Sequence, residues 1–312
     1  MSPSKKEILP IIALLVTNAV WGSTFFMTKM ILQEISSVDF LGIRFALAGI
    51  VMVVVFFPAV RAAGKRTWQK GFILGVIFAT AQIFQTEGLA WTPASVNGFI
   101  TGMYVVLTPL ILWVVFRIRP GKISVVAGAI AFLGLAVLSL RGLSFGYGET
   151  LTLLGALGYS LHIVLMGRWA TKENAASLAT IQMMVVGILC LSVAGYDGLQ
   201  VPTSMGAWAS IIYMTVFASI LALLVQTWAQ AQISAVRTAV VMTTEPVFSA
   251  LFAVMLGGEF LTWRLVVGGS MILGAMLGAE YYAAKQKSFE TPPPGTDFSK
   301  PTQVGQLQEL AN

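Results

Sequence analysis

Charged residues are scarce in this chain of 312 residues. Asp, Glu, Lys and Arg make up 10% of the sequence and hydrophobic residues 57%, whereas soluble domains ordinarily carry about 25% charged residues. This composition excludes a soluble globular protein and predicts an integral membrane protein, with the lipid bilayer as a partner. The net charge of +6 does not indicate nucleic-acid binding, because the basic residues fall in short loops between apolar runs, where they report topology.

Residues that commonly carry catalysis or bind metals are also few. The chain has one cysteine, Cys190, and one histidine, His162, so it cannot form an internal disulfide and has no paired Cys and His ligands. Neither a Gly-x-x-x-x-Gly-Lys-[Ser/Thr] loop nor a His-Glu-x-x-His motif occurs. Ser160 and His162 stand two residues apart and would point to different sides of a helix, which argues against a hydrolase dyad. We therefore expect no enzymatic activity, no cofactor and no catalytic or metal-binding residues.

Long apolar runs, in contrast, follow one another along most of the sequence. At about 20 residues for one crossing of a bilayer, they predict an all-α membrane protein with ten transmembrane helices, at about 9–31, 38–57, 69–90, 94–116, 122–140, 150–167, 176–195, 206–228, 234–256 and 263–282. Fifteen of the nineteen Lys and Arg residues fall on the side of the two chain ends, which the positive-inside rule places in the cytoplasm. The polar, Pro-rich stretch 285–312 predicts a disordered cytoplasmic tail.

The ten runs repeat after 137 residues. The starts of the first five runs, shifted by 137, fall within about four residues of the starts of the last five. Because five is odd, the second copy must enter the membrane in the opposite orientation. We therefore expect a cytoplasmic N-terminus, 1–8, followed by two inverted five-helix repeats, 9–143 and 144–284. Inverted repeats are a recurring plan of transporters, with the substrate site near the midplane where the halves meet. Identical residues in register are Ser23/Ser160, Trp91/Trp228, Pro109/Pro246 and Gly121/Gly258.

The segment 234–255 places an acid and a proline in the middle of an apolar run. A charged side chain at the bilayer centre costs about 2.5–3.5 kcal/mol on the lenient insertion scales, so Glu245 should face a cavity or a partner. Pro246 has no N–H to donate and frees the carbonyl of Met242, and Pro109 occupies the matching place in the first repeat. We predict a cavity wall at Glu245 and hinges at the two prolines. The carboxyl group either binds a proton or a substrate amine, or it stabilises the break in the helix.

Polar and aromatic side chains recur at helical spacing on six of the runs. Their amide, hydroxyl and aromatic groups suit a small amphipathic solute, with hydrogen bonds for its polar end and rings for its apolar body. The alternative is that these side chains bond helix to helix, or, for His162, that the ring is packed. The stripe on the first run also contains Phe25. The predicted substrate-binding residues are Asn18, Trp21, Phe78, Gln82, Gln85, Asn97, Thr101, Tyr104, Tyr159, His162, Ser219, Gln226 and Glu245.

Arg44 and Glu87 are two further charged residues inside apolar runs. Arg44 lies six residues inside the outer end of the second run, and Glu87 lies about four inside the outer end of the third. Because their depths match, we expect a structural ion pair between them rather than contact with a substrate.

Several stretches resemble the EamA-type members of the drug/metabolite transporter superfamily. They are WGSTF at 21–25, FLGIRFALAG at 40–49, GLAWTPASVNGFITGMYVVLTPL at 88–110 and SAVRTAVVMTTEPVFSALFAVMLGGE at 234–259. The resemblance covers about 8–284. It implies a bacterial inner-membrane exporter of amino acids or related metabolites, in which helices 1, 3, 4, 6, 8 and 9 surround a central cavity and helices 5 and 10 lie outside that ring. Similar members include exporters of aromatic amino acids.

Together these observations predict a secondary transporter that exports small amphipathic metabolites, foremost aromatic or other apolar amino acids, by alternating access at a midplane cavity. Because few acidic groups lie in the apolar runs, the sequence favours facilitated export down a gradient, and proton-coupled export through Glu245 is the alternative mechanism. The alternatives are an exporter of drugs or other metabolites, a channel, and a membrane scaffold or sensor that transports nothing. The sequence leaves the oligomeric state open, a monomer included.

Overall fold

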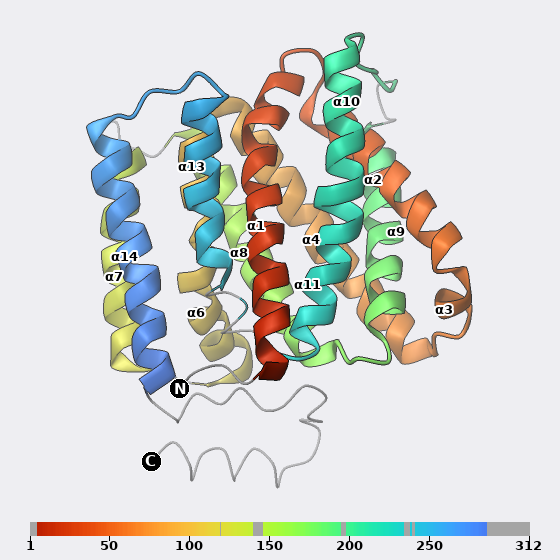
Figure 1. The fold of residues 1–312 in the computed structure, drawn as a ribbon, viewed down its shortest axis with the longest axis horizontal. Helices are drawn as coiled ribbons and strands as arrows, with labels where there is room; N and C mark the ends of the chain where they lie inside the picture. Colours follow the sequence, from red (N-terminus) through yellow and green to blue (C-terminus); the bar gives the residue numbers. More distant parts are fainter. Residues whose placement is uncertain are drawn as a thin grey trace, which may run out of the picture.

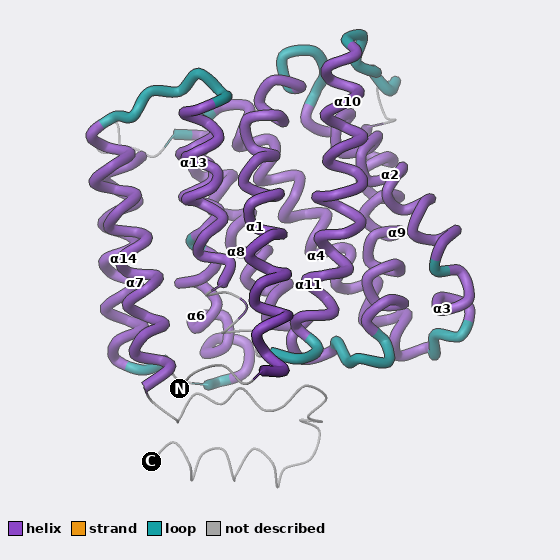
Figure 2. The backbone as a smooth tube through the Cα atoms, in the orientation of Figure 1, coloured by secondary structure: helices purple, strands orange, loops and turns teal. Residues whose placement is uncertain are grey.

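The computed structural model describes residues 5–118, 120–139, 146–194, 198–233, 238 and 241–285. Within these ranges the chain is helical apart from turns and loops (Figure 2). Seven helical segments are long and apolar enough to cross a membrane, and three shorter apolar helices accompany them. The protein is thus an all-helical membrane protein. The predicted tail from residue 286 onward lies outside the described residues, as do residues 1–4.

Five of the long segments are single helices: α1 (Lys5–Ile31), α2 (Ser37–Val55), α4 (Lys65–Trp91), α8 (Tyr147–Trp169) and α9 (Ala175–Ala194), with the short α3 (Phe57–Arg61) between α2 and α4. The other two long segments are interrupted. One consists of α5 (Ala94–Gly102) and α6 (Tyr104–Phe116), and the other of α10 (Met205–Tyr213), the π-helix η1 (Met214–Leu221) and α11 (Ala222–Gln230). The remaining elements are α7 (Lys122–Ser139), the 3₁₀ turn η2 (Met242–Thr244), α13 (Glu245–Met255) and α14 (Trp263–Lys285).

Two loop carboxylates cap helices that lie far away in the sequence. Glu34, which follows α1, accepts hydrogen bonds from the backbone N–H of Ser204 at 3.2 Å and from its hydroxyl at 2.5 Å, before the start of α10. Hydrogen bonding to the charged form lowers the pKa of the Glu34 carboxyl group from its ordinary value. Glu259, which follows α13, accepts from the backbone N–H groups of Ala94 at 2.5 Å and Ser95 at 3.2 Å, at the start of α5. Each acid satisfies N–H groups that a helix cannot bond internally.

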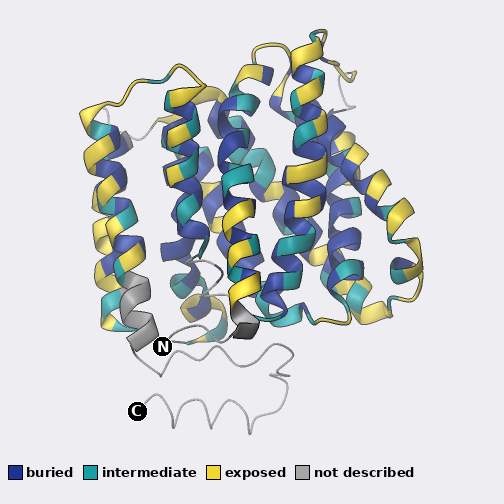
Figure 3. Ribbon diagram, viewed as in Figure 1, coloured by how far each residue is buried: buried dark blue, intermediate teal, exposed yellow. Residues whose placement is uncertain are grey.

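Most helices pack around one common core, and α7 and α14 form a pair at one edge of the bundle (Figure 1). Their backbones meet closely at Gly134 and Gly268, where an added Cβ on either residue would lie 2.7–2.8 Å from the carbonyl oxygen of the other. Small residues allow such close contact between membrane helices. Side chains on the outer faces of the bundle are exposed, as expected for surfaces that meet lipid, and buried side chains gather between the helices (Figure 3).

Candidate functional site

A cavity of about 670 Å³, a volume that includes the space at its opening to solvent, lies among the helices of the bundle. Its walls come from α1, α2, α4, α5, α6, α8, α11, η2 and α13, and neither α7 nor α14 contributes a lining residue. The cavity-lining residues are Trp21, Thr24, Phe25, Thr28, Arg44, Phe78, Gln82, Gln85, Thr86, Leu89, Thr101, Tyr104, Tyr159, His162, Ile163, Gln226, Met242 and Glu245. Amide, hydroxyl and aromatic groups therefore share one chamber with a single carboxyl group and a single guanidinium group.

Ten of the predicted residues line this cavity: Trp21, Phe78, Gln82, Gln85, Thr101, Tyr104, Tyr159, His162, Gln226 and Glu245. The other three, Asn18, Asn97 and Ser219, do not. Asn18 donates through Nδ2 to the carbonyl of Val241 at 2.8 Å and to the Thr244 hydroxyl at 2.9 Å. Asn97 donates to the Thr152 hydroxyl at 2.7 Å. These two side chains bond helix to helix, which corrects the prediction that they face the cavity.

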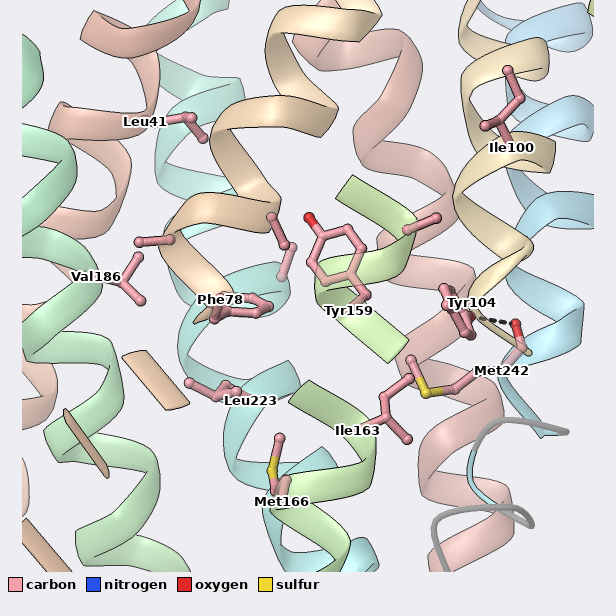
Figure 4. Packing of buried hydrophobic residues seen from close by; sticks show 14 of the residues in the cluster. Leu41, Phe78, Ile100, Tyr104, Tyr159, Ile163, Met166, Val186, Leu223 and Met242 are labelled. Atoms are coloured by element: carbon pink, nitrogen blue, oxygen red, sulfur yellow. Dashed lines mark hydrogen bonds between the residues drawn. The ribbon is translucent and has the colours of Figure 1, made fainter. Parts of the chain in front are cut away.

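The break at Glu245 and Pro246 forms one wall of the cavity. Pro246 stands in the first turn of α13, which begins at Glu245 directly after the 3₁₀ turn η2. The carbonyl of Met242, freed by the proline, accepts a hydrogen bond from the Tyr104 hydroxyl at 2.9 Å (Figure 4). The same hydroxyl lies 2.9 Å from Oε2 of Glu245. The polar groups of the break are therefore bonded across the bundle to the start of α6.

The first half carries a matching irregularity. The segment that contains Pro109 is broken at Met103, where α5 ends and α6 begins. Pro109 itself lies inside α6, where it lacks the N–H that would bond the carbonyl of Val105. Tyr104, the first residue of α6, thus lies at the break of one half and bonds to the break of the other.

An aromatic cluster forms another part of the wall. The ring centroids of Phe78 and Tyr159 lie 5.8 Å apart in an edge-to-face arrangement (Figure 4). The centroid of the His162 ring lies 5.0 Å from that of Phe78. The Tyr159 hydroxyl donates to Oε1 of Gln85 at 2.6 Å, and Gln85 donates to the Thr101 hydroxyl at 3.1 Å. The His162 ring is bonded through Nε2 to Gln182 at 2.9 Å. These contacts fix the rings while leaving their edges toward the cavity.

Two stretches of the chain, 8–140 and 146–279, each match the EamA-like transporter family. The chain belongs to this family. An uncharacterized transporter of Archaeoglobus fulgidus is 30% identical over 273 residues, which cover 87% of this chain and 86% of its own. The uncharacterized transporter YyaM of Bacillus subtilis is 25% identical over 271 residues, which cover 82% and 88%. A crystal structure with 16% identity superposes with a TM-score of 0.67 over 92% of this chain and 100% of its own, which shows a shared fold.

This EamA-like protein is therefore a multi-pass membrane transporter and not an enzyme. The two matches to one family indicate a duplicated architecture. Within the described ranges, no group of three or more His, Cys, Asp or Glu side chains could hold a metal ion.

The predicted ion pair between Arg44 and Glu87 is wrong for this EamA-like transporter. Arg44 donates through Nε to the Ser219 hydroxyl at 2.8 Å and lines the cavity. Glu87 accepts from the Ser37 hydroxyl and, at 3.2 Å, from the Trp91 indole N–H. The equal depth predicted for the two residues did not decide the pairing, because each side chain is bonded to a different partner. Ser219 was expected to line the cavity. Its hydroxyl instead accepts a hydrogen bond from Arg44, which does line the cavity.

Other lining residues extend the predicted stripes by a turn. Thr28 lies seven residues after Trp21 on α1, and Leu89 lies seven after Gln82 on α4, so both continue faces that the spacing had already marked. Thr24 and Thr86 flank the same faces. The remaining ones, Ile163 and Met242, are apolar. No sequence signal separates Ile163 from core residues, whereas Pro246 had marked the carbonyl of Met242.

Proposed function

We propose that this EamA-like transporter exports small amphipathic metabolites, with aromatic or other apolar amino acids as the leading class, by alternating access at the cavity. The observation that carries the proposal is the chemistry of the lining. Phe78, Tyr159 and Trp21 offer aromatic surface, and Gln82 and Glu245 offer polar groups in the same chamber. Pockets for small molecules typically combine apolar walls with a few placed polar groups.

Ten crossings in two inverted repeats, 9–143 and 144–284, are the architecture we propose for this mechanism. Helix directions support the inversion. Lys29, near the end of α1, donates to the carbonyls of Leu89 and Ala90 at 2.8 and 2.9 Å, near the end of α4. The neighbouring Trp91 ring lies 5.8 Å from that of Tyr147, the first residue of α8. Hence α1 ends on the side of the bundle where α8 begins. Helix α8 is the counterpart of α1 after a shift of 137 residues, so the two helices run in opposite directions.

Helix contacts support the same architecture. Under that shift, the contact between α1 and α13 has its counterpart in that between α8 and α6, and the contact between α4 and α8 has its counterpart in that between α1 and α11. The pairs α2 with α9 and α7 with α14 join each element to its own counterpart. Halves related in this way can rock about a site at their junction, which is the motion that alternating access requires.

The break residues support a role in that motion. Pro109 and Pro246 lie where helices α6 and α13 lack a backbone hydrogen bond, and missing bonds are where helices bend. Both prolines are the proposed hinges, and the Tyr104 contacts with Met242 and Glu245 connect them.

Hydrogen-bond counting supports proton coupling over purely facilitated export. The Tyr104 hydroxyl has one hydrogen, yet its oxygen lies 2.9 Å from two acceptors, the carbonyl of Met242 and Oε2 of Glu245. Both contacts are full hydrogen bonds only if Tyr104 donates to Met242 and a protonated Glu245 donates to Tyr104. A protonated Glu245 would hold, in this conformation, the proton that a coupled cycle releases in the other conformation.

For the cell, the proposal places the protein in a bacterial inner membrane with both termini in the cytoplasm. Helix α1 begins and helix α14 ends at the same end of the bundle (Figure 1). The topology predicted from the sequence places most Lys and Arg residues on the side of the two chain ends, which the positive-inside rule assigns to the cytoplasm. The cavity lies within a single chain, so a monomer can carry out the proposed cycle.

Efflux from proteoliposomes tests the proposal. Vesicles holding the purified transporter are loaded in turn with labelled phenylalanine, a labelled polyamine and a labelled cationic drug. We expect phenylalanine efflux that saturates and is accelerated by unlabelled phenylalanine on the far side, because exchange at one alternating site produces counterflow. Selective efflux of the drug or the polyamine would replace the amino-acid proposal. Non-saturating flux without counterflow would indicate a channel, and no flux of any solute would contradict export.

A further inference from the structure

Arg44 is a buried cation whose own protein contacts leave most of its donors unused. The residue is 5% exposed and lines the cavity. Its Nε donates to the Ser219 hydroxyl at 2.8 Å, and within the described part of the chain neither Nη nitrogen takes part in a hydrogen bond. The guanidinium carbon lies 4.9 Å from the Phe45 ring centroid and 5.8 Å from that of Phe40. The unused Nη donors thus belong to a side chain that lines the cavity.

No carboxylate of the described protein compensates this charge. Among the described residues that line the cavity, Glu245 is the only acid, and it is engaged by Tyr104. Glu87, the nearest acid by depth, is held by Ser37 and Trp91. Charged side chains at membrane depth mark substrate or ion pathways because their burial is expensive without a partner. The missing partner of Arg44 is therefore to be sought among the solutes that enter the cavity.

The chemistry of the free donors identifies that partner. A guanidinium group presents its N–H donors in a planar fork that matches the two oxygens of a carboxylate. Tyr159 lines the same cavity as Arg44 and Glu245, so aromatic surface, a basic group and an acidic group are all available to one solute. A solute with an anionic end and an aromatic or apolar body would fit a cavity that offers a guanidinium group together with aromatic surface.

We propose that Arg44 binds the carboxylate of the transported solute, so that the transporter selects carboxylate-bearing amphipathic solutes over their amine and ester analogues. This inference rests on the proposed export function and narrows its substrate class. Ser219 acts as a positioning residue, because its hydroxyl takes the Nε–H and leaves the two Nη groups for the solute. Ser219 lies in η1, a π-helix, and π-helical turns are frequent at functional sites.

A counterflow competition series tests the inference. Vesicles loaded with unlabelled phenylalanine take up labelled phenylalanine, and the competitors are phenylalanine, its methyl ester and phenethylamine, which share one ring but differ in the carboxylate. For the wild type we expect phenylalanine to compete at least about tenfold more strongly than the two others, since a charge-assisted bidentate contact is lost in both. Equal competition by all three compounds would overturn the role of Arg44 while leaving the proposed export intact.

Two substitutions at Arg44 complete the test. Arg44→Gln should reduce the preference for phenylalanine over its ester to within about twofold, and Arg44→Lys should retain part of it, because a lysine binds a carboxylate as a point charge. Ratios of competitors measured on one variant do not depend on how much of it is folded. A wild-type ratio in Arg44→Gln would overturn the inference. Wild-type vesicles that exchange none of the solutes would instead contradict the proposed function itself.

Discussion

The hydroxyl oxygen of Tyr104 lies 2.9 Å from Oε2 of Glu245, and this contact joins the breaks of two membrane segments that are far apart in the sequence. Tyr104 begins α6 after the turn at Met103, and Glu245 begins α13 after the turn η2. The pair is fully inside the bundle, with Tyr104 1% and Glu245 6% exposed. Any movement of α6 relative to α13 must stretch or break it.

Removing the hydroxyl should therefore destabilise the protein. Tyr104→Phe leaves the Glu245 carboxyl group without its hydroxyl partner and the Met242 carbonyl with only the backbone N–H of Glu245. A buried unsatisfied group costs about 1–3 kcal/mol of the free energy of unfolding. Thermal melting in detergent measures the loss. Tyr147→Phe is the matched control, because Tyr147 is 62% exposed and should change stability by less than about 0.5 kcal/mol. Equal melting temperatures for both variants would show that the Tyr104 contact contributes nothing.

Glu245→Gln should preserve the contact and abolish proton coupling. The glutamine amide can donate to the Tyr104 oxygen as a protonated carboxyl group does, so we expect stability within about 1 kcal/mol of the wild type. Efflux from proteoliposomes under imposed pH gradients is the measurement. If Glu245 carries the coupled proton, the variant loses the pH response of efflux. Unchanged transport with an unchanged pH response would leave only the facilitated mechanism.

The pair of helices at the edge of the bundle should depend on glycine at one position of α7. An added Cβ on Gly134 would lie 2.8 Å from the carbonyl oxygen of Gly268, so Gly134→Ala should force α7 away from α14 and cost about 1–3 kcal/mol. The control is Gly274→Ala on α14, where no atom lies within 4 Å of the added Cβ. Melting in detergent compares the two. A Gly134→Ala protein as stable as the control would contradict the packing of α7 on α14.

Much of the site was predictable because helical spacing alone tells which residues share a face. The faces through Gln82 and Gln85, and through Thr101 and Tyr104, were read from spacings of three and four residues, and all four residues line the cavity. The chemistry of Pro246 predicted that the carbonyl of Met242 would lack its usual helical N–H partner. This carbonyl indeed accepts a hydrogen bond from the hydroxyl of Tyr104, on another helix.

What failed was the direction of single side chains relative to neighbouring helices. Asn97 lies on the same face as Thr101, but one turn away it meets Thr152 of α8 instead of open space. Arg44 was paired with Glu87 by depth, which fixes position along the membrane normal but not the angle around the helix. The π-helix η1 that holds Ser219 depends on tertiary packing, and its sequence gives no signal of it.

The most direct test of the account is to fill the cavity without touching the rest of the bundle. Gln82 and Thr80 stand two residues apart on α4, but Gln82 lines the cavity while Thr80 is exposed on the outer face. Phenylalanine efflux from proteoliposomes is measured for Gln82→Trp and Thr80→Trp after both have been shown to melt as cooperatively as the wild type. We predict a loss of at least about tenfold for Gln82→Trp, since the added ring occupies the solute's volume, and less than about twofold for Thr80→Trp. Equal efflux by the two variants would contradict transport through this cavity.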